Sequence, residues 1–362
     1  MTSRRHFLRN LVAAPLLTTG CRWNGTSAPA VKDITELKVG HFIGGKTYVL
    51  YRAFYNGRLD DAKTPIQLYS RFMHQNDPFI PVPRDLKQLK KWRKRKEGKK
   101  IKFGKVSGIE VLDAIMQGEL HGGTVGESSF LSYLQPGMPL VAVALLQRDS
   151  IERPAKAIAI RQDLTINKPE DLMGLRFASR RAGPGEEVLL YLYLDSLGIN
   201  WNKSIEIIPQ MDDHVMEAEL GKSIDGGLFH ITTIRRLYKA KTGKIHRLMD
   251  WASPHLSFGL LVFHKEVVEN NTESIRRLLK GYHDQIKYEE SIPIEEKLLH
   301  KDFPLRMAQE FQGMSLPQNV NPPFVNLRDL ETVQSHLHQY GFINQTFPLE
   351  PFVNHELLAS VL

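Results

Sequence analysis

The chain has 362 residues, of which 42% are hydrophobic and 24% are charged, and it contains one cysteine. This length suggests two domains or one large bilobal unit, and the composition excludes a disordered chain, a collagen and a coiled coil. A single cysteine excludes a disulfide framework and a metal site built from cysteines. The formal net charge is +8, and the sequence has no run of about 18 apolar residues that would predict a membrane-spanning helix.

The first 21 residues have the pattern of an export signal. Arg4 and Arg5 precede a Phe-Leu pair, and the short apolar stretch 11–17 follows them. This arrangement resembles the twin-arginine signal, and the apolar stretch is too short to span a bilayer. Cys21 resembles the acylated cysteine of bacterial lipoproteins, although Thr18 stands where that pattern has leucine. An ordinary signal peptide that is cut elsewhere is the alternative.

From this segment we expect export by the twin-arginine route and a lipid anchor on Cys21. The protein would then lie in the periplasm or on the outer face of the cytoplasmic membrane, with residues 1–20 as the signal and 21–35 as a polar tether. Enzymes that use nucleotides are not favoured there, because ATP, NAD and coenzyme A are absent outside the cytoplasm.

Strand and helix patterns alternate through the rest of the chain. The continuous apolar run 140–146 is typical of a strand that is covered on both faces. The alternation predicts an α/β fold with parallel or mixed sheets. Strands are predicted at 36–40, 101–103, 122–126, 140–146, 156–160, within 171–178, at 205–208, 224–229 and 256–263. Helices are predicted at 48–55, 108–118, from 128, at 186–197, 214–220 and in most of the chain after 271.

The segment from Gly40 to Thr47 matches the phosphate-binding pattern G-x-x-x-x-G-K-[ST]. In a nucleotide-binding enzyme Lys46 would reach the phosphates and Thr47 would bind magnesium. We find no convincing apolar strand that ends in an aspartate suited to that magnesium. Without a nucleotide, Gly44, Gly45, Lys46 and Thr47 would still offer backbone N–H groups at a helix start to an anion or a polar head. A plain turn is the alternative.

Two further helix starts are candidates for ligand contact. Glu127, Ser128 and Ser129 follow a predicted strand, and simple N-capping is the alternative for the serines. In the loop that contains Arg181, Gly183 and Gly185, the glycines would allow a ligand to approach the backbone, and the arginine could bind a carboxylate, sulfonate or phosphate. A solvated arginine is the alternative there. His230, at the end of a later predicted strand, is either a ligand contact or a buried structural histidine.

Catalysis, metal binding and nucleic-acid binding have little support. The sequence has neither G-x-S-x-G nor H-E-x-x-H, and His336 and His338 are two residues apart on a predicted helix, so they face different sides. We therefore expect no catalytic residue, no metal and no cofactor. The segment 87–105 has eleven Lys and Arg residues and one acid, which predicts a solvated face or, alternatively, docking to an acidic partner or anionic lipid. Nucleic acid is not expected, because aromatic platforms are missing.

The order of the segments resembles periplasmic solute-binding proteins of the nitrate/sulfonate/taurine and thiamine-pyrimidine-precursor (NMT1-like) group. Residues 107–149 resemble their first-lobe core, with a helix, a Gly-Glu-Leu turn and a strand, and His121 stands where the family has aspartate. Residues 166–199 resemble the start of the second lobe, with a "DL-x-G-x" turn. Residues 218–237 and 330–343 resemble that lobe's last strand and the family's late helix.

The resemblance implies a bilobal type II periplasmic-binding-protein fold, with two mixed or parallel sheets flanked by helices and a hinge of two crossings. The first lobe would comprise 36–153 and 254–362, with a basic insertion at about 60–100, and the second lobe would comprise 154–253. The implied function is the extracytoplasmic solute-binding component of an ABC importer, which traps a small polar or anionic solute between the lobes and delivers it to permease subunits.

The resemblance implies a binding protein and not an enzyme. Its thiamine-pyrimidine synthase relatives use clustered cysteines, which this chain lacks. The alternatives that remain are a P-loop nucleotide-binding enzyme and a sensor or scaffold that kept the binding-protein fold.

Overall fold

A computed structural model describes most of the chain after residue 33. The structure covers residues 34–41, 47–60, 63–71, 78–84, 108–148, 156–178, 187–200, 204–208, 213–230, 243–245, 257–292 and 319–362. The signal and tether (1–33), the segment 87–105 and the strand predicted at 101–103 lie outside these described residues. No helix within the described part has the length and apolar character needed to cross a membrane.

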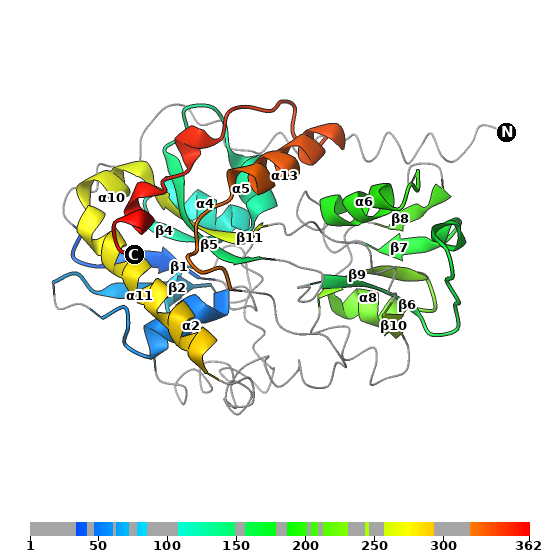
Figure 1. The fold of residues 1–362 in the computed structure, drawn as a ribbon, viewed down its shortest axis with the longest axis horizontal. Coiled ribbons are helices and arrows are strands. Elements are labelled where there is room, and N and C mark those ends of the chain that lie inside the picture. Colours follow the sequence, from blue (N-terminus) through cyan, green and yellow to red (C-terminus); the bar gives the residue numbers. More distant parts are fainter. Residues whose placement is uncertain are drawn as a thin grey trace.

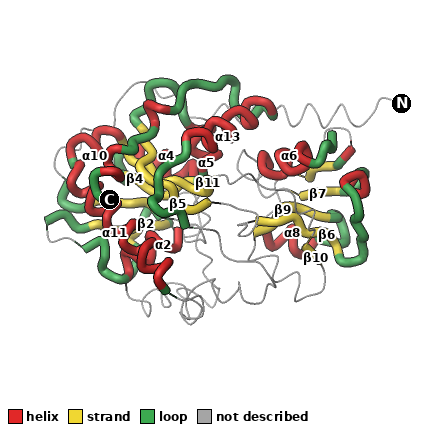
Figure 2. Tube along the Cα trace, viewed as in Figure 1, coloured by secondary structure: helices red, strands yellow, loops and turns green. Residues whose placement is uncertain are grey.

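The described strands form two mixed sheets (Figures 1 and 2). In the first sheet β1 is parallel to β2 and β4, whereas β11 lies between β4 and β5 and is antiparallel to both. A late strand therefore completes a sheet that the early part of the chain begins. The sheet order is β3 (Ile80–Pro81), β2 (Ile66–Ser70), β1 (Leu37–Gly40), β4 (Gly122–Val125), β11 (Ser257–His264) and β5 (Leu140–Arg148).

Helices cover both faces of the first sheet. One apolar cluster includes buried side chains of α2, α10, α11 and α14, and a second includes those of α4, α5 and α13. The helices that share a cluster also contact one another, as α2 does with α11 and α5 with α13. The bounds are α2 (Tyr48–Tyr55), α4 (Gly108–Met116), α5 (Glu127–Tyr133), α10 (Lys265–Asn270), α11 (Thr272–Ser291), α13 (Leu327–Gln339), η4 (Glu350–Phe352) and α14 (Glu356–Ala359).

The second sheet combines parallel and antiparallel pairs. Strand β9 is parallel to β7 and antiparallel to β6, and β8 is parallel to β7. The sheet order is β10 (Gly243–Ile245), β6 (Lys156–Arg161), β9 (Gly226–His230), β7 (Arg176–Ala178) and β8 (Glu206–Ile208). Its helical elements are η2 (Pro169–Leu172), α6 (Glu187–Ser196) and α8 (Asp213–Glu219).

Helices α6 and α13 connect the two halves of the molecule. Figure 1 shows the end of α13 reaching toward α6. The ring of Tyr191 packs edge-on against Tyr340, with centroids 5.1 Å apart, and stacks on Phe342 at 6.3 Å. The Tyr340 hydroxyl donates a hydrogen bond to Asp195 on α6. Burial and this carboxylate raise the pKa of Tyr340, so its hydroxyl keeps the proton at neutral pH.

The predicted fold class, α/β with two mixed sheets flanked by helices, is confirmed. Residues 66–70 and 80–81, which lie in the stretch expected to be an insertion, instead form β2 and β3 at the edge of the first sheet. Leu37 to Gly40 pair in register with Ile66 to Tyr69, so this part of the stretch belongs to the sheet. The lobe boundaries remain predictions.

A carboxylate at the start of β9 links three strands of the second sheet. Asp225 accepts hydrogen bonds from the Arg176 backbone N–H (2.9 Å) and from its guanidinium (3.0 Å). The Arg161 guanidinium on β6 lies 3.3 Å from the same carboxylate. The hydrogen bonds from Arg176 hold the pKa of Asp225 below its ordinary value.

We predict that Asp225→Asn lowers the free energy of unfolding by about 2 kcal/mol at pH 7, because the carboxylate charge is removed and one of its two acceptor oxygens becomes an NH2 donor that faces Arg176. The native carboxyl has a lower pKa than the unfolded one, so its contribution is present above the unfolded pKa of about 3.9 and is lost as the pH falls through the native pKa. Urea unfolding of both proteins between pH 7 and pH 3 should show the difference shrinking below about pH 4. The control Asp163→Asn, on an exposed carboxylate, should change stability by less than about 0.5 kcal/mol; an equal effect from both variants would contradict the prediction.

Candidate functional site

Two helix starts lie beside the carboxyl ends of the neighbouring strands β1 and β4 in the first sheet. The two strands are parallel, and Gly40 lies opposite Gly123. Thr47 is the N-cap residue of α2, which follows β1, and Gly126 is the N-cap residue of α5, which follows β4. Open α/β sheets bind ligands outside the carboxyl ends of their strands. The region beside the carboxyl ends of β1 and β4 is therefore the candidate site.

Glycines allow the strands to pack closely at this edge. A Cβ added to Gly123 would lie 2.9 Å from the Gly40 carbonyl oxygen, and one added to Gly122 would overlap the ring of Phe263 on β11. The Thr124 hydroxyl lies 3.5 Å from the Gly40 carbonyl oxygen. These glycines, which precede the predicted ligand contacts, are therefore required by packing against neighbouring strands.

The structure describes only Thr47 of the four predicted contacts in the first loop. Thr47 is buried, with 1% of its surface exposed. Gly44, Gly45 and Lys46 lie outside the described residues, so their contact with a ligand remains a prediction.

The three residues at the start of α5 have different surroundings. Glu127 is buried, and its Oε2 accepts a hydrogen bond of 2.8 Å from the Gly259 backbone N–H on β11. Ser129 packs toward α4, because its Cβ lies 2.8 Å from the position that a Cβ on Gly108 would occupy. Ser128 is buried at the same helix start. Glu127 thus has a structural partner on β11, Ser129 packs toward α4, and ligand contact by either serine remains a prediction.

Of the four candidates expected on the second sheet, the structure describes only His230. His230 ends β9, which is parallel to β7, so both strands finish at the same edge. The loop with Arg181, Gly183 and Gly185 follows β7 in the sequence and lies outside the described residues. The topology therefore puts His230 and the carboxyl end of β7 on the same side of the sheet, and the contacts of the loop that follows remain a prediction.

His41 is a buried polar residue beside the candidate site that the sequence analysis did not single out. It follows β1 directly, is fully buried, and neither ring nitrogen has a hydrogen-bond partner. Its ring stacks on Tyr51 of α2, with centroids 5.9 Å apart and planes 20° apart. Burial lowers the pKa of His41 to about 3, so the imidazole is neutral at pH 7. The available signal was its place as the first residue after the strand.

No group of three or more His, Cys, Asp or Glu side chains that could hold a metal ion occurs within the part of the chain that the structure describes. The shifted pKa values of His41 and His121 come mainly from burial.

The fold is that of periplasmic binding proteins. The sulfonate-binding SsuA of an ABC transporter from Methylobacillus flagellatus KT is 14% identical, with 91% of this chain and 94% of that chain covered and a TM-score of 0.63. The aliphatic sulphonate binding protein SsuA from Escherichia coli is 13% identical, with 89% and 93% covered and a TM-score of 0.63. The nitrate-binding protein NrtA from Synechocystis PCC 6803 is 9% identical, with 91% and 88% covered and a TM-score of 0.61.

The chain belongs to the NMT1/THI5-like family, whose model matches residues 95–293. The predicted group of proteins is thereby confirmed. Among curated proteins, none matches the sequence.

We predict that Glu127→Ala lowers the free energy of unfolding by about 2–3 kcal/mol, because the Gly259 N–H would be buried without an acceptor. Glu127→Gln keeps an acceptor oxygen and should lose about half as much. Urea unfolding monitored by circular dichroism measures both values. Glu331→Ala, on the exposed side of α13, is the control and should change stability by less than about 0.5 kcal/mol. Equal stability of the wild type and Glu127→Ala would show that the bond to β11 contributes nothing.

Proposed function

We propose that the protein is the extracytoplasmic solute-binding component of an ABC importer, which binds a small polar or anionic solute and delivers it to permease subunits. The observation that supports this most strongly is the fold itself. The chain forms two mixed sheets, and β11 lies between β4 and β5 in the first of them. This structure matches binding proteins over about nine tenths of the chain. Membership of the NMT1/THI5-like family supports the same function.

The P-loop enzyme is not supported by the comparisons, which match binding proteins. We therefore propose that the protein binds its ligand without catalysing a reaction.

The proposed solute contacts lie on both sheets. On the first sheet they are Gly44, Gly45, Lys46, Thr47 and Ser128. On the second they are Arg181, Gly183, Gly185 and His230. Glu127 and Ser129 would support the site indirectly, because Glu127 binds β11 and Ser129 packs on α4.

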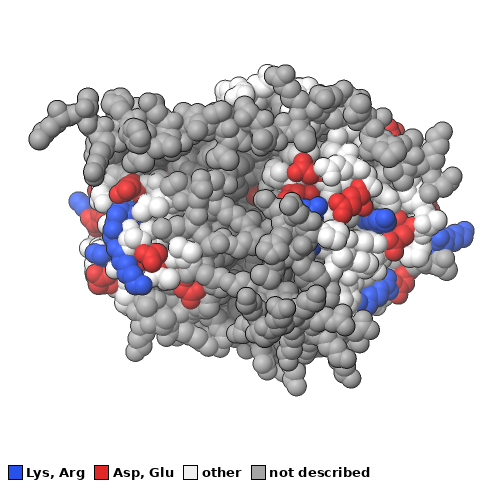
Figure 3. Space-filling model, turned by 180° about the vertical axis from the view of Figure 1, so that it is seen from behind, with Lys and Arg blue, Asp and Glu red and all other residues white. Residues whose placement is uncertain are grey.

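The proposed location is the periplasm or the outer face of the cytoplasmic membrane, after twin-arginine export and with a lipid on Cys21. Figure 3 shows acidic and basic side chains interspersed among the described residues of one face. The described residues of that face therefore show no patch of a single sign, and a permease contact made by them would depend on shape and local charge pairs.

We predict that Lys46→Ala and Arg181→Ala each lower the affinity for an anionic solute by roughly 10- to 150-fold, since each would remove a charge-assisted bond of about 1.5–3 kcal/mol. A thermal-shift screen with alkanesulfonates, nitrate, bicarbonate, amino acids and pyrimidines would find the solute, and calorimetric titration would then compare the variants. Lys265→Ala, at an exposed position of α10, should keep the wild-type affinity. Magnesium-dependent ATP hydrolysis by the wild type would overturn the proposed function.

We predict that Cys21→Ala moves the mature protein from the membrane fraction to the soluble periplasmic fraction, because the thiol that would be acylated is removed. Fractionation of cells followed by immunoblotting measures this. A wild-type protein that is already soluble would show that Cys21 is not lipidated.

A further inference from the structure

The contact between α6 and α13 joins the two halves of the molecule, which are the first sheet with its helices and the second sheet with η2, α6 and α8. Within the described residues, no other helix or strand of one half packs as extensively on an element of the other half. The predicted lobe boundaries, after 153 and after 253, lie outside these residues. The contact between α6 and α13 is therefore the part of the junction that the structure shows.

An apolar cluster runs through this contact from one half to the other. Leu337 of α13 and Leu194 of α6 are fully buried members of it, and it extends to Ala142 in the first sheet and to Phe177 in the second. The two other clusters of buried residues in the described part each stay within one half. Domains that move freely usually meet at polar interfaces, whereas an apolar interface keeps domains together. The packing of α6 on α13 thus has the character of a core.

Aromatic rings extend the contact beyond the end of α13. Tyr191 on α6 lies edge-on to Tyr340 at 5.1 Å and stacks on Phe342 at 6.3 Å, so one ring of the second half has two ring partners in the first. The Tyr340 hydroxyl donates a hydrogen bond to Asp195 at the exposed border of the contact. The rings and the hydrogen bond together fix the orientation of the two elements as well as their separation.

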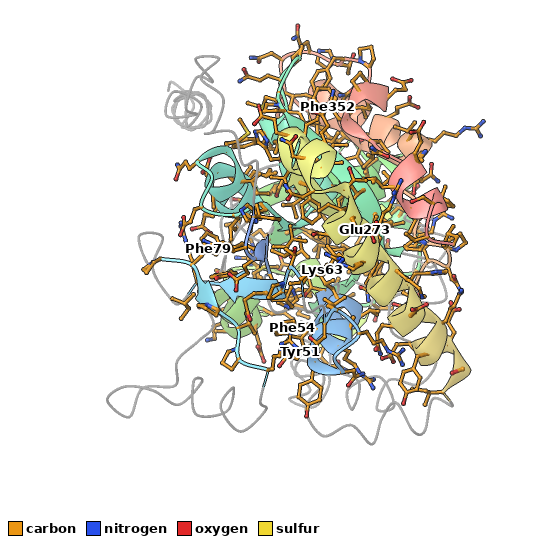
Figure 4. All side chains as sticks on the ribbon, turned by 90° about the vertical axis from the view of Figure 1, so that its left-hand side faces the viewer. Tyr51, Phe54, Lys63, Phe79, Glu273 and Phe352 are labelled. Atoms are coloured by element: carbon orange, nitrogen blue, oxygen red, sulfur yellow. The ribbon has the colours of Figure 1, made fainter. Side chains whose placement is uncertain are left out.

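The side of the molecule away from this contact is built differently. Figure 1 shows α2 and α8 on that side, and in Figure 4 Tyr51 of α2 lies at the other end of the first half from Phe352, which follows α13. Tyr55 on α2 is 41% exposed, and Val215 on α8 is 46% exposed. Within the described residues these two helices do not pack on each other as α6 does on α13.

We propose that the contact between α6 and α13 is a permanent joint, which stays closed with and without solute while the halves move apart on the side of α2 and α8. This inference rests on the proposed solute-binding function, because the motion is the one that would admit and hold a solute. It gives Tyr191, Tyr340, Phe342 and Asp195 a positioning role, since they would align the proposed contacts on one sheet with those on the other.

Spin labels on two pairs of introduced cysteines test the joint. In a Cys21→Ser background, which removes the one native thiol, the near pair is Asn200→Cys with His338→Cys and the far pair is Tyr55→Cys with Val215→Cys. All four positions are exposed. Electron paramagnetic resonance measures both distances without solute and with methanesulfonate, taurine, nitrate, bicarbonate, glutamine or cytosine, and calorimetry shows which of these probes bind. We expect the near pair to keep one distance throughout and the far pair to shorten when a probe binds.

Variants of the contact show whether its side chains hold the joint. Tyr191→Ala removes the ring that both ring contacts share, so it should broaden the near-pair distances without solute. Tyr340→Phe keeps the rings and loses the hydrogen bond to Asp195, and it should have the same effect to a smaller extent. Tyr288→Ala, at a tyrosine of α11 that is 37% exposed, is the matched control and should leave the near pair unchanged. Circular dichroism checks that each variant is folded.

The outcomes separate the joint from the proposed function. A near-pair distance that changes when a probe binds would overturn the joint and leave the proposed function intact, as would a far-pair distance that stays constant while a probe binds. If no probe bound, the proposed function would lose its support, and the free protein would decide on the joint. A far pair with a broader distribution than the near pair would then support it, and equal widths would overturn it. An unchanged near pair in both folded contact variants would also overturn it.

Discussion

The insertion of β11 between β4 and β5 is the constraint on which the rest of the architecture depends. Strand β5 is almost completely buried. Its neighbour in the sheet is β11, and all five strands of the second sheet, β6 to β10, lie between β5 and β11 in the sequence. Backbone groups at this depth must be paired, so β5 and β4 each need the residues of β11 as partners. The chain must therefore pass from the first sheet to the second after β5 and come back to the first sheet at β11. Glu127 strengthens the same junction, because it accepts a hydrogen bond from Gly259 across 132 residues of sequence.

The two sheets share one packing feature, which is a pair of glycines in a strand that lies between a parallel and an antiparallel neighbour. Strands β4 and β9 each have a parallel partner on one side and an antiparallel partner on the other. Each contains a pair of glycines, at 122–123 and at 226–227. A Cβ on Gly123 would lie 2.9 Å from the Gly40 carbonyl oxygen, and one on Gly227 would lie 2.7 Å from the Ala178 carbonyl oxygen. The glycine pairs thus allow close approach to the parallel neighbour at the strand that leads into each candidate site.

Much of the fold could be predicted from the sequence, because several elements have strong local patterns. The apolar run of β5 and the amphipathic α4 are examples. Strands β2, β3 and β10 were missed. They are short, and pairing with neighbours defines them more than composition does. In the site, the helix start at Ser128 was predicted, but the partner of Glu127 and the burial of His41 depend on distant segments. Neither property is visible in a local pattern.

The contact between α6 and α13 limits how the two halves of the molecule can move relative to each other. A hydrogen bond such as that from Tyr340 to Asp195 is lost when its atoms separate by more than about half an ångström. A rigid rotation displaces atoms in proportion to their distance from the axis. Any rotation that preserves this bond and the packing of Tyr191 on Tyr340 must therefore have its axis close to the two helices. Rotation about a distant axis would instead separate α6 from α13 and expose three aromatic rings to water.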